Sequence, residues 1–469
     1  MNRRGLFLLW VAAIVLLGGC SLAPPYERPA PPVPAQWPTG AAYPEAEGDA
    51  TATQVSLPAW REFLPDGRLR KVIETALANN RDLRLAALNV DRARAYYGIQ
   101  RAELLPSVNA VGSGAKARVP ADLSSTGSAT TSERYDVNLG VASWEIDFFG
   151  RIRSLKDRAL ENYLATDQAR RSAEILLVST VAQAYLVLAA DREALALVTS
   201  TLEAQEASYN LIRKRYDVGI VSGLDLRRAQ SQVETARRDV ARYTQGVAKD
   251  ENTLNLLVGS PVPPELLPGD LGGVKPPGEI SAGLSSKVLL SRPDIQAAEH
   301  QLKAANANIG AARAAFFPRI LLTGSAGTAS AELSGLFKSG SGVWSFAPQI
   351  VMPIFDARLW SAYDVTRIDK DISVTQYEKA IQTAFRETAD ALAVEGTVNR
   401  EIAAQASLVE AFAEAYRLSC ARYDKGIASY MDVLDAQRAL YAAQQVLIAL
   451  RLYGMTNRVT LYKVLGGGA

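Results

Sequence analysis

Two stretches of this sequence run for nearly seventy residues almost without helix breakers. Residues 151–218 contain no proline and no glycine, and residues 357–425 contain only Gly396. Ala, Leu, Arg, Glu and Gln are frequent in both, with apolar residues at helical spacing. At about 1.5 Å per residue, each stretch predicts a helix roughly 100 Å long, whereas an average helix has about 11–12 residues. Helices of this length indicate a coiled coil, a bundle or a helical barrel.

The sequence also repeats itself. Residues 215–230 read RYDVGIVSGLDLRRAQ, and residues 422–437 read RYDKGIASYMDVLDAQ. RDLRLAALNVDRARAYYGIQRAELLP, from residue 81, likewise aligns with RPDIQAAEHQLKAANANIGAARAAFFP, from residue 292. We therefore expect two copies of one unit, at 65–260 and 280–469, joined by a linker at 261–279 that is rich in Pro and Gly. A tandem repeat of this kind builds one pseudo-symmetric architecture.

Between the helical patterns, each copy contains strand-like segments. Strand pairs are expected at about 106–148 and 318–355, around polar loops at 115–133 and 330–342. The segment 131–149 alternates, and its apolar positions share one face: Tyr135, Val137, Leu139 and Val141. The runs are close to the 9–11 or so residues that a tilted membrane strand needs. Four strands cannot close a barrel, and an open edge in lipid leaves backbone groups unpaired, so several chains must share one barrel.

The N-terminus predicts export and anchoring. Residues 1–19 combine two arginines, an apolar run and small residues, which is the pattern of a secretory signal. Leu-Gly-Gly-Cys, ending at Cys20, fits a lipobox, so we expect Cys20 to be lipidated; an ordinary signal peptide with an incidental cysteine is the alternative. Residues 20–64, rich in Pro and Ala, predict an extended tether. Cys420 is the only other cysteine, so no disulfide is expected.

Composition and motifs argue against several functions. The 51 basic and 49 acidic residues nearly cancel, which gives no electrostatic reason to expect nucleic acid. The single histidine, His300, and the lack of Cys/His clusters or a Gly-rich phosphate loop give no reason to expect an enzyme, a cofactor or a metal site. Residues 173–190 are the most membrane-like part of the mature sequence, but they lie inside a long helical pattern and carry polar side chains. We expect them to pack against other helices.

The repeated segments have the residues of helical hairpins, with turns at about 216–224 and 423–431. Gly219 and Gly426 stand where a helix C-terminus favours a left-handed residue, and Ser222 and Ser429 are suited to cap the next helix. The second copy then differs from the first. Asp435 replaces the arginine of the first copy, Arg228, and shares a helix face with Asp432.

Together these features resemble the TolC family of outer-membrane channel proteins, and most closely its OprM-like lipoprotein branch. The resemblance is carried by WREFLPDGRLRKVIETALANNRDLRLAALNV (60–90), WEIDFFGRIRS (144–154), the segment at 292–318 and LYKVLGGG (461–468). It implies an α+β membrane protein: a homotrimer whose 12-stranded outer-membrane β-barrel, with four strands per chain, continues into a long periplasmic α-helical barrel. Such proteins are passive exit ducts of tripartite efflux systems. Their partners are a periplasmic adaptor and, in this branch, an inner-membrane pump of the resistance-nodulation-division type.

The resemblance also implies roles for residues at the two turns. Asp432 and Asp435 match acidic residues that line the pore gate, and Tyr423 matches a latch tyrosine of the closed state, with Asp225 as its partner. Arg228 and Arg438 are further latch candidates that could pair with Asp435 or Asp225. The turns themselves match the adaptor-docking tip: Tyr216, Gly219, Ser222, Gly426 and Ser429. The alternatives are a solvated helix surface for the aspartates, packing roles for the tyrosines, and, for the whole chain, a lipid-anchored structural coiled-coil protein without a pore.

Overall fold

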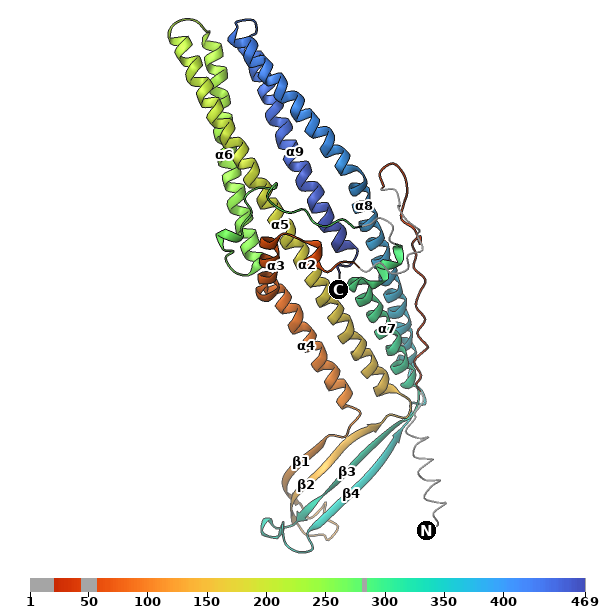
Figure 1. Cartoon of the computed structure of the whole chain (residues 1–469). Coiled ribbons are helices and arrows are strands. Elements are labelled where there is room, and N and C mark those ends of the chain that lie inside the picture. The colour runs from red at the N-terminus through yellow and green to blue at the C-terminus, as the bar shows by residue number, and fades with distance from the viewer. Residues whose placement is uncertain (1–20, 44–56, 281–284, 469) are drawn as a thin grey trace. The chain divides into compact units, whose positions relative to one another are not determined.

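The computed structural model describes residues 21–43, 57–280 and 285–468, so the predicted signal peptide and Cys20 lie outside the described residues. The first half of the chain contains α2 (Trp60–Phe63), α3 (Gly67–Asn79), α4 (Arg81–Ala102), β1 (Val108–Val119), β2 (Thr130–Ile146), α5 (Arg151–Asp217) and α6 (Gly223–Val258). The second half contains α7 (Pro293–Ala314), β3 (Arg319–Ser330), β4 (Gly342–Val351), α8 (Ala357–Asp424) and α9 (Tyr430–Val464). Both halves follow one order: a helix, two strands, a very long helix and a returning helix (Figure 1).

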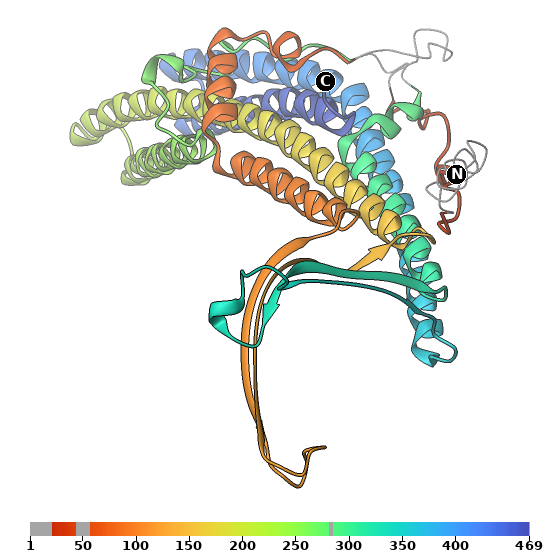
Figure 2. The ribbon, with the colours of Figure 1, turned by 90° about the horizontal axis from the view of Figure 1, so that it is seen from below.

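The long helices and the four strands expected from the sequence are confirmed. The two long helices, α5 and α8, contain 67 and 68 residues. The strands form one antiparallel sheet in the order β1-β2-β3-β4. Contacts within the chain divide it into two units. One unit contains the sheet, and the other contains the paired helical hairpins. Figure 2 shows how strongly the ribbon of β1 and β2 curves.

The first polar loop was predicted too long. Strand β1 continues to Val119 and β2 begins at Thr130, so ladder pairing occupies both ends of the expected 115–133 loop. Backbone pairing does not depend on apolar side chains, and here charged residues support it across the strands. Lys116 stands opposite Glu133 and forms an ion pair with it. The polar composition of these strand ends therefore led to a predicted loop that was too long at both ends.

The strand register gives the sheet two different faces, because directly paired residues project to the same side. One face, here called the apolar face, carries Val108, Ala110, Tyr135, Val137, Leu139, Val141, Ile320, Leu322, Ala326, Trp344, Phe346 and Ile350. The opposite face is mainly small and polar and includes Asn109, Ser113, Asp136, Asn138, Thr323, Ser325, Ser345 and Gln349. On this polar face the hydroxyls of Ser325 and Ser345 lie 2.8 Å apart. The pattern suits a sheet between lipid and an aqueous lumen.

A β-bulge preserves the apolar face along β2. Between Val141 and Trp144 the strand advances three residues while its partner advances two, from Gly324 to Leu322. The extra residue shifts the alternation by one position, so that Trp144 joins the apolar face. At the bulge Ser143 has a φ of 54°, the one positive φ of a non-glycine residue in the described ranges. Its backbone N–H donates to Thr323 Oγ1 at 3.1 Å.

The unit with the hairpins has a continuous hydrophobic core. Helix α5 supplies a buried stripe that includes Val181, Tyr185 and Leu188, and Phe63 stacks on Tyr462 with ring centroids 4.4 Å apart. By length and composition α5 is the one helix of the described ranges that could cross a membrane, and 56% of its most apolar window is buried. The stripe falls within residues 173–190, so that segment packs against other helices, as expected.

The proline-rich N-terminal segment is held against α7. Arg28 makes two hydrogen bonds to the buried carboxylate of Glu299, at 3.0 and 2.7 Å. Asn306 Nδ2 donates to the carbonyl of Pro24 at 2.8 Å, and Arg313 Nη1 donates to that of Leu22 at 3.2 Å. Residues 22–28 are therefore extended but fixed at several points along one helix.

Candidate functional site: the two hairpin turns

The two hairpins turn in the same way. Gly219 and Gly426 have φ values of 75° and 71°, the left-handed conformation predicted for these positions. The N–H of Gly219 donates to Tyr216 O at 2.9 Å, and that of Gly426 donates to Tyr423 O at 2.9 Å. A side chain at either glycine would be strained in this conformation. The repeat therefore preserves a turn geometry as well as a sequence.

The helices that leave the turns are capped by the predicted serines. Ser222 Oγ accepts from the N–H of Asp225 at 3.2 Å, and Ser429 Oγ accepts from that of Asp432 at 3.4 Å. The aspartates return the interaction, because Asp225 accepts from Ser222 Oγ at 2.7 Å and Asp432 accepts from the N–H of Ser429 at 2.9 Å. The sequence reasoning missed this structural role of Asp225 and Asp432, although the spacing Ser-x-x-Asp predicts a capping box.

A shared hydrophobic cluster supports both turns. Its buried members come from both hairpins and are Ile212, Ala229, Tyr430, Val433 and Leu434. Cys420 packs against the cluster as a small hydrophobic residue and is a free thiol. The rings of Tyr423 and Tyr430 lie 5.6 Å apart, and the guanidinium of Arg215 lies 5.3 Å from the Tyr423 ring. Burial raises the pKa of Tyr430 to about 12, and the nearby Tyr423 adds to the effect.

The hydroxyl of Tyr423 is buried and has no hydrogen-bond partner among the described residues. Asp225 lies near enough to raise the pKa of Tyr430, but the hydrogen bond expected between Tyr423 and Asp225 is not formed within the chain. A buried hydroxyl without a partner is unusual and unfavourable by about 1–3 kcal/mol. The latch pairing stays a prediction, because the Tyr423 hydroxyl donates no hydrogen bond within the described residues of this chain.

The two arginines predicted to belong to the latch pair within their own helices. Arg228 Nη1 lies 3.8 Å from Asp225 Oδ1, and Arg438 Nη1 lies 3.7 Å from Asp435 Oδ1. Arg438 also reaches the other hairpin, where its Nε donates to Gln232 Oε1 at 3.3 Å. The gate candidates on α9, Asp432 and Asp435, are both exposed.

The turns expose apolar side chains to solvent. The sequence reasoning did not single them out: Val218, Ile220, Leu224 and Ile427. Tyr216 is exposed as well. Exposed apolar residues that cluster on two neighbouring turns are typical of a protein-binding surface.

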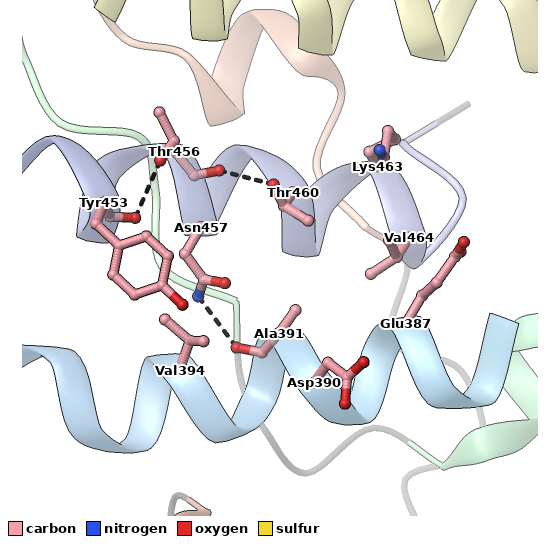
Figure 3. A pocket seen from close by; sticks show the side chains of 10 residues that line it. All are labelled: Glu387, Asp390, Ala391, Val394, Tyr453, Thr456, Asn457, Thr460, Lys463 and Val464. Atoms are coloured by element: carbon pink, nitrogen blue, oxygen red, sulfur yellow. Dashed lines mark hydrogen bonds between the residues drawn. The ribbon is translucent and has the colours of Figure 1, made fainter. Parts of the chain in front are cut away.

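Two further features lie away from the turns. A groove of about 340 Å³ between α8 and α9 is lined partly by Glu387, Asp390 and Thr460 (Figure 3). Two other lining residues join the helices, because Asn457 Nδ2 donates a hydrogen bond to Ala391 O at 3.0 Å. None of the predicted site residues lines it.

The other feature is a pair of carboxylates between α5 and α6. Burial and the neighbouring Asp191 raise the pKa of Asp250 from 3.8 to about 6, and burial also raises that of Asp191. Gly246 leaves room for this pair, because a Cβ there would lie 2.7 Å from Asp191 Oδ2.

Comparison with known proteins identifies the family. The chain matches the model described as "Outer membrane efflux protein" at residues 72–260 and 284–467. It is 50% identical over 468 residues to the antibiotic efflux pump outer membrane protein ArpC of Pseudomonas putida, across 99% of this chain and 96% of that protein. The toluene efflux pump outer membrane protein TtgC, also of Pseudomonas putida, matches with the same identity and coverage. The open-state crystal structure of the Neisseria gonorrhoeae MtrE outer membrane channel matches with a TM-score of 0.85 and 39% identity, covering 96% of this chain and 98% of that chain.

The two-faced sheet and the paired helical hairpins thus define a subunit of an outer-membrane channel. The chain belongs to the outer membrane efflux protein family, the TolC family, as the sequence resemblance implied. It is the outer-membrane channel of an efflux pump, and this family contains channels rather than enzymes.

Proposed function

We propose that three copies of this chain form one duct, with a 12-stranded barrel in the outer membrane and a helical barrel in the periplasm. The observation that carries this proposal is the pair of open sheet edges. Strand β1 pairs with β2 alone and β4 with β3 alone in the described ranges, although the sheet has an apolar face suited to lipid. In lipid each unpaired backbone group is unfavourable by several kcal/mol, so the edge of one chain must meet that of the next.

Unpartnered helix faces next to the two edge strands support the same arrangement. Helix α4, which leads into β1, buries none of its residues and exposes Leu85, Leu88, Tyr96 and Ile99. Helix α8, which follows β4, exposes Trp360, Val365, Ile368 and Ile372. A head-to-tail contact that buries both faces closes into a ring when the rotation per chain fits. Native mass spectrometry of the detergent-purified protein tests this: we expect the mass of three chains, and a monomer would overturn the assembly.

The exposed apolar turns are the proposed docking surface for the periplasmic adaptor. Tyr216, Gly219 and Ser222 build the first turn and Gly426 and Ser429 build the second, so these residues would present the apolar side chains to the partner. Ile220→Asp and Ile427→Asp should each weaken adaptor binding in a pull-down assay. Leu123→Asp, at an exposed leucine of the loop between β1 and β2, is the matched control. Equal binding by all three variants would contradict docking at the turns.

We place the gate at the same turns. Three chains would bring six carboxylates, from Asp432 and Asp435, around one axis, where like charges attract cations. Tyr423 would complete its hydrogen bond in the closed ring with Asp225 of an adjacent hairpin, and Arg228 and Arg438 would hold the aspartates in place. The double variant Asp432→Ala/Asp435→Ala should lose cation selectivity in planar bilayers. Unaltered conductance and selectivity would remove these residues from the pore.

The proposed cargo is antibiotics and aromatic solvents, because the names of the two Pseudomonas relatives mention antibiotics and toluene. The duct would receive this cargo from an inner-membrane pump of the resistance-nodulation-division type through the adaptor. A deletion strain should become sensitive to toluene and to antibiotics, and the intact gene should restore tolerance. Full tolerance without the gene would point to other cargo.

The remaining part of the proposal is the lipid anchor at Cys20, which supports retention at the outer membrane. Mass spectrometry of the mature N-terminus should find a diacylglyceryl and an acyl group on this residue. An unmodified cysteine inside a longer N-terminus would indicate an ordinary signal peptide.

A further inference from the structure

A small cavity lies among α5, α6 and α9 and is lined in part by the candidate latch residue Arg438. Its volume is about 40 Å³, and its lining includes Gln205, Asp239, Gln437 and Tyr441. Both hairpins contribute to it, because α5 and α6 form the first hairpin and α9 belongs to the second. Most of the lining residues carry a polar group, although their apolar stems make up most of the cavity surface.

Three of the polar side chains around this cavity are deeply buried, and they are incompletely paired. The exposed fractions of Gln205, Asp239 and Gln437 are 5%, 4% and 9%. Gln205 Oε1 is buried without a hydrogen-bond partner among the described residues. Asp239 accepts from Arg238 at 2.8 Å, and the Tyr441 hydroxyl reaches its second oxygen at 3.4 Å, a long hydrogen bond. Buried acceptors without donors are rare in native proteins and call for a partner.

We propose that the cavity is a hydration site that holds a small cluster of ordered water. A buried water needs about 10–15 Å³ and two to four polar partners, so the cavity has room for about three molecules. Gln205 and Asp239 offer acceptors, whereas the amide groups and Arg438 offer donors. Water serves both kinds of group at once. A bound cation would face Arg238 and Arg438, and a bound anion would face Asp239.

The water cluster would link the gate to the first hairpin. Arg438 lines the cavity, pairs with Asp435 at 3.7 Å and donates to Gln232 on α6 at 3.3 Å. Water that bridges Arg438 to Gln205 would therefore join the proposed pore residue Asp435 to α5 as well as to α6. This consequence rests on the proposed gate role of Asp435, whereas the hydration site itself does not.

The substitution Gln205→Leu distinguishes a wet cavity from a dry one. If water satisfies Gln205, leucine removes its hydrogen bonds, and the midpoint temperature of unfolding falls for the full-length protein in detergent. In a dry cavity the same change removes an orphan acceptor, so the midpoint rises. Gln245→Leu, at an exposed position of α6, is the matched control for the effect of leucine on the helix. A rise in the midpoint, or a shift no larger than that of the control, overturns the proposal.

A density map of the unaltered protein at high resolution gives a second reading. We expect ordered water within hydrogen-bond distance of Gln205 Oε1, and an empty cavity overturns the proposal. Replacing Na⁺ by K⁺ or choline at constant ionic strength should leave the unfolding midpoint unaltered. A shift specific to one ion would identify an ion site instead and overturn the proposal. These measurements do not involve conductance, so they test the hydration site independently of the proposed gate.

Discussion

Replacing Tyr423 by phenylalanine tests the proposed latch most directly, because the structure leaves its buried hydroxyl without a partner among the described residues. If the hydroxyl bonds to an adjacent hairpin in the closed ring, each copy loses a hydrogen bond worth about 0.5–1.5 kcal/mol. Three copies lose about 1.5–4.5 kcal/mol, and a tenfold change in equilibrium corresponds to about 1.4 kcal/mol. The ratio of closed to open channels should then fall by a factor of roughly ten to a thousand.

Single-channel recording in planar lipid bilayers measures this ratio, and the mean conductance of Tyr423→Phe should rise. Its oligomer should also dissociate at a lower temperature. Tyr209→Phe, at a partly buried tyrosine of the same cluster, controls for the loss of any hydroxyl there. The opposite result is equally informative. If the hydroxyl has no partner in the assembly, its removal stabilises the protein by about 1–3 kcal/mol and leaves conductance unaltered, which would refute the latch.

Three other predictions follow from local geometry. Asp432→Ala should destabilise its hairpin by about 0.5–2 kcal/mol, measured by thermal unfolding, because it removes a capping box, whereas Asp435→Ala should leave stability nearly unaltered. Equal effects would contradict the separate roles. Asp250 has a higher pKa in the folded state than its ordinary 3.8, so the folded protein binds more protons between about pH 4 and 6 and loses stability as pH rises through that window. Asp250→Asn should flatten this dependence of the unfolding midpoint, and parallel profiles would contradict it. Deleting Ser143 should remove the bulge and leave Trp144 on the apolar face, because plain alternation from Val141 then reaches it, so heat-modifiable oligomers should still form in outer-membrane fractions; their loss would show that the bulge itself is needed for assembly.

Local rules predicted the helices and their ends well. A run without proline or glycine over residues 151–218 favours one uninterrupted helix, and α5 fills nearly all of it. The turn at Gly426 and the cap at Ser429 follow from backbone conformation within a few residues, so short sequence patterns contain the necessary information.

The number of strands was predicted, but their ends and the bulge were not. The ends of β1 and β2 depend on cross-strand pairs such as Lys116 with Glu133, which no single segment reveals. The bulge, in contrast, was visible in retrospect. The apolar positions of β2 change from odd to even numbers between Val141 and Trp144, and such a change of parity in one strand requires an extra residue.

The latch could be predicted only as a set of candidates. Arg228 and Arg438 each have a carboxylate three residues earlier in their own helix, and the structure contains those local pairs at 3.8 and 3.7 Å. Longer pairings depend on where the neighbouring hairpins stand, and neither periodicity nor motif spacing specifies that. The unpaired hydroxyl of Tyr423 likewise results from packing, so only the folded structure reveals it.

The N-terminal segment has a mechanical consequence. Its proline-rich composition suggests a loosely attached tether, yet Leu22, Pro24 and Arg28 are each hydrogen-bonded to a different side chain of α7. A pull on the amino end would therefore reach α7 within a few residues, with little chain to straighten first. The load would be shared among Arg313, Asn306 and Glu299 along one helix. A force applied to the chain ahead of residue 22 would therefore be transmitted directly to α7.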